Sequence, residues 1–532
     1  MGLFAAVALR LRGGFDWLRD HREFTVPVAV GAVALLLRLH GLGDKPFWLD
    51  EVTSLRRATA SLPDLVGDSL YNTHYPTYFV LLWLVAKIGT SQWLLRLPSA
   101  LCGAFCAALA CVIGGKVAGE RAGVVAGLLL AVSPFEVQFG QEARSYTLVS
   151  CLILTALFGM VRLAQQPAAA ALPLTDKAAP RGAWIGYTLG TAAALDVLNV
   201  AVPWLAAANL GAFAIAQAAG ASRRRFWRNW ITAQLAILLV WAPLVVAVYV
   251  SRGGAVLDGA DWAPAGTSRT LWSIIAPVYL LRISSFITYD LMPAKLPELG
   301  VAVVAAAALG AWRLRRQPTL LAVLGWAVLV LPVGLCLVSV LVPVLVPRYF
   351  AWGAAPFSIL AGAGLGRLRG PRFAAVAASL GAAALINLAP YYGYETKPRW
   401  DLLAAKLATT ARPGDVVLLN SYYAYSMLSV FAVRAGLDER RVKLTWQLSE
   451  AAQIAPGRDV WAVYGRTGQN SRQPAGDYQQ SLSSLGHAAV EHSVGRYIVL
   501  WRFLEPNGPD PAALVTPAPD HNDLSLRDEP AR

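Results

Sequence analysis

Two adjacent carboxylates, Asp50 and Glu51, follow Trp48 in a stretch of chain that is otherwise strongly apolar. Adjacent side chains on a helix point about 100° apart, so we expect these two to have different surroundings. Asp50 could serve as a general base that takes the proton of an attacking hydroxyl or amine, with Glu51 in a supporting role. The alternative for Asp50 is a helix N-cap, because a helical pattern follows it.

Three arginines, Arg96, Arg144 and Arg348, could supply the positive charge that such a reaction needs. The planar guanidinium group matches a phosphate well, and a leaving phosphate requires cationic stabilisation. The alternative for each arginine is that its side chain extends to the membrane interface without binding a ligand.

Further polar and aromatic residues are expected near the same side of the protein. They are Trp48, Tyr71, His74, Tyr75, Glu142, Tyr146 and Tyr349. The aromatic rings could hold a sugar or could belong to an interfacial belt. We expect Glu142 to pair with an arginine rather than to act as an acid, and His74 to form hydrogen bonds rather than to bind a metal.

The composition is that of a polytopic membrane protein. Of 532 residues, 56% are hydrophobic and 15% are charged, and the mean hydropathy is +0.49. Soluble domains carry about 25% charged residues. The net charge of +14 is assigned to basic cytoplasmic loops and not to nucleic-acid binding. The five cysteines lie in apolar segments without paired spacing, which predicts neither disulfides nor a zinc site.

Twelve apolar runs are candidate membrane segments. They lie near 24–40, 75–90, 97–115, 121–138, 145–164, 184–200, 202–219, 230–251, 297–312, 319–346, 350–366 and 373–391. The basic loops place the N-terminus in the cytoplasm and the chain after 392 outside. These assignments require an odd number of crossings, so we predict eleven, with 75–90 lying in the interface or entering and returning.

The predicted fold class is mainly α, a membrane helical bundle with a small C-terminal α/β domain. Residues 1–391 form the membrane domain, 392–505 an extracytoplasmic α/β domain, and 506–532 a Pro-rich, charged tail that we expect to be disordered. The Gly-rich stretch 361–370 follows no strand, so it predicts close helix packing and not a nucleotide-binding loop.

Five motifs together resemble the GT-C superfamily of membrane glycosyltransferases. They are "WLDE", "HYPTYFVLLWL", "LLRLPSAL", "SPFEVQFGQEARSYTL" and "PRYFAWGAAP", and the resemblance covers about residues 24–391. The most similar subgroup is glycosyltransferase family 39, which includes protein O-mannosyltransferases and, more distantly, bacterial lipid A aminoarabinose transferases. The resemblance implies an eleven-span topology, a polyprenyl-phosphate sugar as donor and inversion at the anomeric carbon.

The resemblance also implies roles for individual residues. Asp50 matches the acidic residue taken as catalytic base, and Glu51 matches its neighbour. Arg96 matches the arginine that opens the third apolar segment, while Arg144 and Tyr146 match the motif of the second outer loop.

The chain departs from the aminoarabinose transferases at two places. They carry Glu-Lys-Pro where this chain has His74, Tyr75 and Pro76, and an Arg-Tyr pair where it has Thr53 and Ser54. The lysine available for the lipid phosphate and one metal ligand are therefore missing, which leaves a divalent cation and the sugar open. The long outer insertion of eukaryotic protein mannosyltransferases is also absent.

The expected function is an inverting transfer from a polyprenyl-phosphate sugar to a lipid, glycan or protein acceptor, at the outer face of a cell (inner) membrane. The alternative is a transporter or flippase of lipid-linked sugars. A transporter is expected to place charges near the middle of the membrane in broken helices, often with repeated halves. Here the polar residues gather at one face and the sequence shows no repeat, which favours the enzyme.

Overall fold

The computed structural model describes residues 21–253, 268–279, 281–283, 295–296, 298–340, 344–438, 440–451, 458–465, 475–482 and 490–503. The chain divides into two compact units, Met1–Lys397 and Pro398–Arg532. The predicted disordered tail at 506–532 lies outside the described residues.

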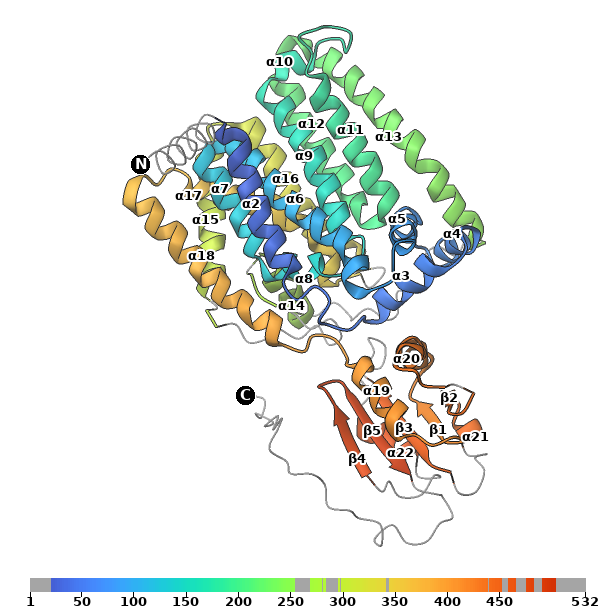
Figure 1. Ribbon diagram of the computed structural model, residues 1–532. Coiled ribbons are helices and arrows are strands. Elements are labelled where there is room, and N and C mark those ends of the chain that lie inside the picture. The colour runs from blue at the N-terminus through green and yellow to red at the C-terminus, as the bar shows by residue number, and fades with distance from the viewer. Residues whose placement is uncertain are drawn as a thin grey trace, which may run out of the picture. The chain divides into compact units, whose positions relative to one another are not determined.

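The first unit consists of helices that pack along one another (Figure 1). Its first half contains α2 (Arg22–Leu39), α3 (Leu49–Thr59), α4 (Leu62–Tyr71), α5 (Thr77–Ala86), α6 (Gln92–Ala118), α7 (Glu120–Val132), α8 (Pro134–Gly140), α9 (Tyr146–Gln165), α10 (Pro167–Ala170) and α11 (Arg181–Val197). Its second half contains α12 (Val202–Ala218), α13 (Arg223–Ser251), α14 (Ser268–Tyr279), α15 (Glu298–Leu314), α16 (Pro318–Val338), α17 (Ala354–Leu365) and α18 (Gly370–Gly393). Short 3-10 turns are η1 (Asn199–Ala201), η2 (Gly220–Ser222) and η3 (Pro347–Gly353).

Each predicted apolar run falls on a helix, and the predicted class of a helical membrane bundle is confirmed. Within the described ranges, six helical segments are long and apolar enough to cross a membrane: Gln92–Ala118, Tyr146–Gln165, Asn199–Ala218, Gly220–Ser251, Pro318–Val338 and Gly370–Gly393. The bent pair α7 and α8 makes a seventh if it counts as one span. Eleven crossings therefore remain a prediction. Helix α5, in the run 75–90, has 10 residues and spans about 15 Å, half of a bilayer's hydrocarbon core.

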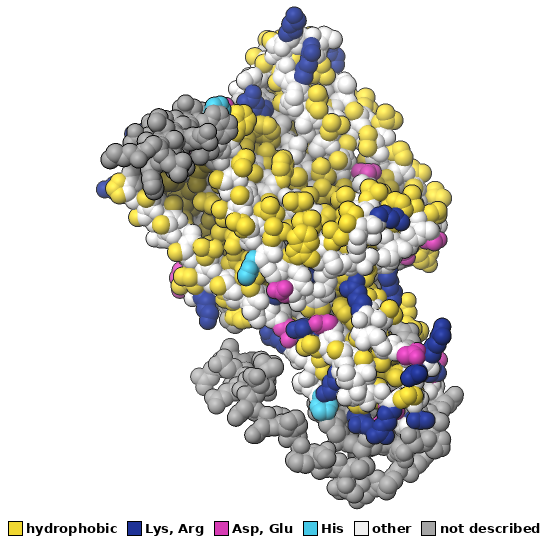
Figure 2. All heavy atoms as spheres, in the orientation of Figure 1, with side chains coloured by type: hydrophobic (Ala, Val, Ile, Leu, Met, Phe, Trp, Pro, Cys, Tyr) yellow, Lys and Arg dark blue, Asp and Glu magenta, His cyan; other side chains and the backbone are white. Residues whose placement is uncertain are grey.

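The surface of the helical unit matches a membrane environment. Figure 2 shows hydrophobic side chains over the middle of its visible face, with Lys and Arg mainly toward its two ends. Helix α13 carries many of the exposed apolar side chains, among them Leu239 and Val250. Such a surface is stable against lipid and not against water.

Glycines let neighbouring helices approach closely, as predicted for the stretch 361–370. A Cβ atom on Gly364 of α17 would collide with the carbonyl oxygen of Ala306 in α15. In the same way, a Cβ atom on Gly310 of α15 would collide with the carbonyl of Leu360. Only a hydrogen at these positions permits the observed packing of α15 against α17.

A break between α7 and α8 shapes the loop that follows them. The two helices meet at an angle of 60° at Ser133. Pro134 has no N–H group, so it cannot donate to the carbonyl of Leu130. Arg38 of α2 supplies donors instead, from Nη2 to the oxygen of Leu130 at 3.3 Å and from Nη1 to the oxygen of Ala131 at 3.2 Å. This buried arginine therefore stabilises the bend that directs α8 into the loop at 141–145.

The second unit is a small α/β domain. Its sheet has the order β2-β1-β3-β5-β4, with β1 parallel to β2 and β3 and with β5 antiparallel to β3 and β4. The strands are β1 (Val416–Leu419), β2 (Lys443–Thr445), β3 (Val460–Gly465), β4 (Val490–Val494) and β5 (Ile498–Phe503), and the helices are α19 (Trp400–Thr410), α20 (Tyr422–Ala435), α21 (Leu448–Ala451) and α22 (Ala475–Ser481).

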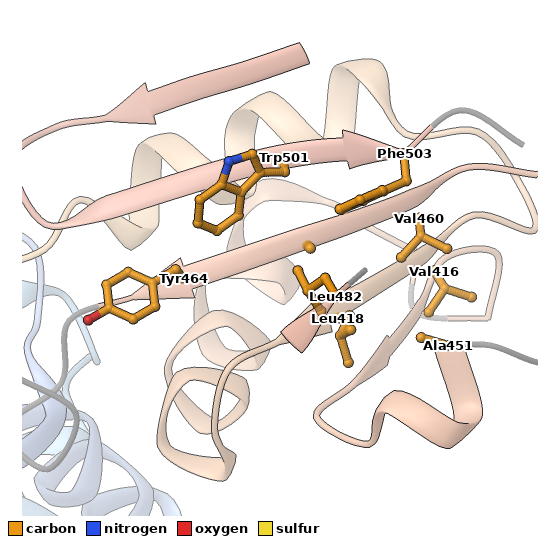
Figure 3. Close-up of a cluster of buried hydrophobic side chains, with 9 residues drawn as sticks. Val416, Leu418, Ala451, Val460, Tyr464, Leu482, Trp501 and Phe503 are labelled. Atoms are coloured by element: carbon orange, nitrogen blue, oxygen red, sulfur yellow. The ribbon is translucent and has the colours of Figure 1, made fainter. Parts of the chain in front are cut away.

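All residues of β1 and β3 are buried, as is typical of central parallel strands. Figure 3 shows side chains of the core on one side of this sheet, including Val416, Tyr464 and Trp501. A Pro-Gly-Asp turn at 413–415 precedes β1, and its Asp415 accepts hydrogen bonds from the Arg412 and Asp459 amides and from the Trp461 indole.

Candidate functional site

Glu51, in the first turn of α3, is fully buried and lies at the centre of a group of ionic contacts. Arg96 of α6 donates from Nε to Oε1 at 2.7 Å and from Nη2 to Oε2 at 2.9 Å. The Lys397 ammonium donates to Oε2 at 2.8 Å, and the Ala143 amide donates to Oε1 at 3.0 Å. One carboxylate thus joins the first loop, the start of α6, the second loop and the end of the first unit.

Arg96 uses all five of its N–H donors inside the protein. Besides its two bonds to Glu51, it donates from Nη1 to the carbonyls of Leu42 and Lys45 at 2.9 and 2.8 Å, and from Nη2 to the carbonyl of Pro46 at 3.1 Å. The sequence predicted Arg96 as a substrate contact. This geometry instead makes it a residue that shapes the loop at 42–51.

Asp50 differs from Glu51 in that its side chain is 21% exposed. Its Oδ2 atom lies 3.8 Å from Arg144 Nη2 and 3.8 Å from Arg348 Nη1. Burial raises the pKa of Asp50, but Arg348 and Arg144 hold that pKa below its ordinary value. The carboxylate is therefore ionised at neutral pH and partly exposed.

The capping alternative for Asp50 does not describe the structure. Helix α3 begins at Leu49, and its N-cap residue is Trp48. Glu51, the third helical residue, accepts a hydrogen bond of 3.4 Å from the Trp48 amide, as in a capping box. Asp50 is left inside the first turn, where a negative charge is favoured by the helix dipole.

Aromatic rings surround the two arginines beside Asp50. The Arg144 guanidinium lies over the rings of Phe79 and Tyr146, 5.8 Å from each centroid. The Arg348 guanidinium lies 5.4 Å from the ring of Trp48 and 5.9 Å from that of Tyr349. Cation–π contacts of this kind hold buried arginines in place while their edges remain available for hydrogen bonds.

Glu142 is fully buried in the second loop, and neither of its carboxylate oxygens has a hydrogen-bond partner among the residues that the structure describes. Its salt-bridge partner is Lys397, at 3.8 Å, and not the arginine that we predicted. Burial raises the pKa of Glu142, and the nearby charges of Glu51 and Asp50 raise it further, while Lys397 opposes them.

His74 is held in its neutral form. Burial lowers its pKa to about 3, with Arg144 and Arg57 acting in the same direction. Within the described residues, no group of three or more His, Cys, Asp or Glu side chains could hold a metal ion.

The other predicted aromatic residues separate. Trp48, Tyr146 and Tyr349 lie against the arginines of the site, whereas Tyr71, at the end of α4, is 67% exposed. Tyr75 is buried, and its charged neighbour is Asp196 near the end of α11. Among the described contacts, none joins Tyr71 or Tyr75 to Asp50.

Two basic residues of the site were not among the predicted site residues: Arg57, which the sequence left open as a helix-surface, headgroup or phosphate contact, and Lys397. Arg57 is buried, pairs with Asp68 at 2.6 Å and lies over the Phe79 ring at 4.5 Å, so it braces α3 against α4. Lys397 follows the last apolar run by a few residues, in "YETKP". A lysine so soon after the last apolar run indicates a residue at the membrane surface, near the site, whereas we predicted that Lys397 belongs to the C-terminal domain.

Comparison with known proteins agrees with this architecture. Residues 73–249 match the family model described as dolichyl-phosphate-mannose-protein mannosyltransferase. ArnT from Cupriavidus metallidurans is similar in structure, with TM-scores of 0.55 in the apo state and 0.52 bound to undecaprenyl phosphate; each is 14% identical, and each match covers 91% of this chain and 99% of that one. The archaeal oligosaccharyltransferase AglB from Archaeoglobus fulgidus, in complex with an inhibitory peptide and a dolichol-phosphate, matches with a TM-score of 0.52 and 12% identity over 84% of this chain and 70% of that one. No curated protein matches the chain.

These likenesses establish the fold. The chain is a multi-pass membrane protein with the fold of the GT-C superfamily of membrane glycosyltransferases, and the resemblance that its motifs predicted is confirmed. The family likeness itself concerns residues 73–249, which are similar to the dolichyl-phosphate-mannose-protein mannosyltransferases.

Proposed function

We propose that the chain is an inverting glycosyltransferase that moves a sugar from a polyprenyl-phosphate donor to an acceptor at the extracytoplasmic face of the membrane. One observation carries the proposal: the partly exposed carboxylate of Asp50 lies 3.8 Å from the guanidinium groups of both Arg144 and Arg348. This places a carboxylate suited to act as a base beside two guanidinium groups suited to bind a phosphate.

In the proposed reaction, Asp50 removes the proton from an acceptor hydroxyl or amine as that group attacks the anomeric carbon. The bond from the anomeric carbon to the phosphate oxygen breaks, and its electron pair leaves with the phosphate. The products are the glycosylated acceptor and a polyprenyl phosphate. Because the lowered pKa of Asp50 keeps it ionised, it is ready to accept the proton without prior activation.

Arg144 and Arg348 are assigned to the donor phosphate. Both side chains are almost entirely buried, so their charges act in a region of low dielectric, where electrostatic stabilisation of a leaving group is strong. They come from the second loop and from η3, which lie far apart in the sequence. The bound undecaprenyl phosphate of ArnT and dolichol-phosphate of AglB support a lipid phosphate as the donor's leaving group.

We place the site at the extracytoplasmic face of the cell's inner membrane, with the N-terminus in the cytoplasm and the C-terminal domain extracytoplasmic. The loops that carry Arg223–Arg228 and Arg313–Arg316 support this orientation, because basic loops remain in the cytoplasm. The acceptor is a lipid, a glycan or a protein.

The test is transfer by the purified full-length chain in lipid nanodiscs, supplied with a panel of polyprenyl-phosphate sugars and acceptors. Mass spectrometry would follow both the released polyprenyl phosphate and the glycosylated acceptor. We expect transfer by the wild type and its loss in Asp50→Asn, while Asp64→Asn, an exposed carboxylate of α4, serves as the matched control. Equal, background-level transfer by wild type and Asp50→Asn across the panel would overturn the proposal. Movement of a lipid-linked sugar across vesicles, unaffected by Asp50→Asn, would instead support a flippase.

A further inference from the structure

Lys397 is a buried lysine with a specific pair of partners. It lies shortly after α18, at the end of the first unit, and its side chain is only 2% exposed. Its ammonium donates to Glu51 at 2.8 Å and lies 3.8 Å from Glu142 Oε1. Burial of a lysine is costly unless its charge is compensated, so these two carboxylates are what permit the lysine to lie there.

Hydrogen bonds from the first loop hold the chain around Lys397 in place. The Lys45 ammonium donates to the carbonyls of Tyr391 and Tyr394 at 2.8 and 2.6 Å and to the hydroxyl of Thr396 at 3.4 Å. Thr396 itself is fully buried. The segment 391–397 is therefore held against the loop that carries Asp50, and Lys397 has little freedom to move elsewhere.

We propose that Lys397 is a positioning residue of the transfer site: by holding the carboxylates of Glu51 and Glu142 to one ammonium group, it sets Asp50 against Arg144. The inference rests on the proposed function. Glu51 is directly bonded to Asp50 in the first turn of α3, so the position of one constrains the position of the other. Glu142 is two residues from Arg144 in the second loop. Lys397 thus joins the residue beside the base to the loop of the phosphate-binding arginine.

If Lys397 acts through its charge, its removal should cause a defect that depends on pH, which a role in packing alone would not. The charged or titratable groups that act on Glu142 are Lys397, Glu51, Asp50, Arg348, Arg96 and Tyr391. Removal of Lys397 would remove the only salt bridge that Glu142 forms among the described residues. An ionised Glu142 would then be repelled by the carboxylates of Glu51 and Asp50 without a compensating cation. A protonated Glu142 would be tolerated, so the defect must grow as pH rises through the pKa of Glu142.

The experiment uses the full-length protein in nanodiscs and measures sugar transfer from pH 5 to 9. Lys397→Met is expected to reduce kcat by about 10- to 100-fold at neutral pH, in line with the cost of misplacing a catalytic group by about 1 Å, with a smaller change in KM for the donor. The defect is expected to increase toward alkaline pH. Adding Glu142→Gln to Lys397→Met is expected to remove that pH-dependent part, and Lys397→Arg, which keeps the charge, is expected to retain more activity than Lys397→Met.

Lys443→Met is the matched control, because Lys443 forms an exposed ion pair with Glu450 in the second unit. The inference is overturned if Lys397→Met keeps the wild-type kcat, or if its defect is independent of pH and unchanged by Glu142→Gln.

Thermal unfolding separates this inference from the proposed function. If the wild type transfers no sugar with any donor, the proposed function fails, and the unfolding temperatures then decide about Lys397. A higher unfolding temperature for Lys397→Met/Glu142→Gln than for Lys397→Met at alkaline pH supports the charge coupling, and an equal or lower one overturns it.

Discussion

Arg96 of α6 binds the Glu51 carboxylate through two hydrogen bonds, of 2.7 and 2.9 Å, although 45 residues separate them. Neither side chain is exposed, and the remaining donors of Arg96 hold three backbone carbonyls of the first loop. The pair therefore fixes the first turn of α3, and with it the orientation of Asp50. Of the two adjacent carboxylates, one is fully occupied in structure, which leaves the other available for chemistry.

Replacement of Glu51 by Gln is expected to destabilise the protein severely. The change leaves Arg96 and Lys397 buried with no carboxylate between them, a situation that costs about 3–5 kcal/mol. Thermal unfolding of the purified protein measures the effect. The control is Asp401→Asn, which breaks a partly exposed pair with Arg399 and should cost about 1 kcal/mol or less. Equal unfolding temperatures for the two variants would contradict the role of Glu51.

Arg144→Lys is expected to lower kcat/KM for the donor by about 10- to 100-fold, although the charge is retained. Lysine lacks the planar fork that binds a phosphate through two hydrogen bonds, and it stacks less well between Phe79 and Tyr146. Steady-state kinetics with a polyprenyl-phosphate sugar would measure the change. Arg121→Lys is the control. Arg121 of α7 is exposed and donates to the carbonyl of Leu368, in the chain before α18, so this substitution should leave kcat/KM at the wild-type value. An unchanged kcat/KM in Arg144→Lys would argue against bidentate phosphate binding.

The acid limit of activity is expected to move in Arg348→Met. A general base works only when it is deprotonated, so activity falls as pH decreases through the pKa of Asp50. Arg348 is the strongest influence that lowers this pKa, and burial acts in the opposite direction. Its removal raises the pKa, and the fall in activity should therefore begin at a higher pH than in the wild type. Rates measured from pH 3.5 to 7 test this, and an acid limb at the same pH in both proteins would exclude Arg348 as the cause.

Arg38→Met is expected to weaken the bend between α7 and α8. The carbonyls of Leu130 and Ala131 would lose their donor, and each buried unsatisfied group costs about 1–3 kcal/mol. We expect a lower unfolding temperature together with reduced transfer, because this bend directs the loop that carries Arg144. Arg121→Met, whose exposed side chain also donates to a carbonyl, provides the comparison. A wild-type unfolding temperature in Arg38→Met would show that the bend is stable without the arginine.

The sequence by itself determined the helical membrane bundle, the position of its apolar segments and the small α/β domain after them. These features depend on local composition and periodicity, which act on a few turns of chain at a time. The adjacent pair Asp50 and Glu51 and the arginines Arg144 and Arg348 were also recognisable, because polar residues at the ends of apolar segments stand out against their neighbours.

Only the tertiary structure decided which of these residues contact one another and which are exposed. It assigned Arg96 to Glu51 and to three carbonyls, exposed Tyr71, and brought Lys397 to Glu51 across 346 residues of sequence. Ion pairs and hydrogen bonds of this kind depend on how helices pack and on which side chains lose water, and neither is encoded in the spacing of residues along one segment. For this reason the chemistry of the site could be expected from the sequence, whereas the contacts between its residues could be seen only in the fold.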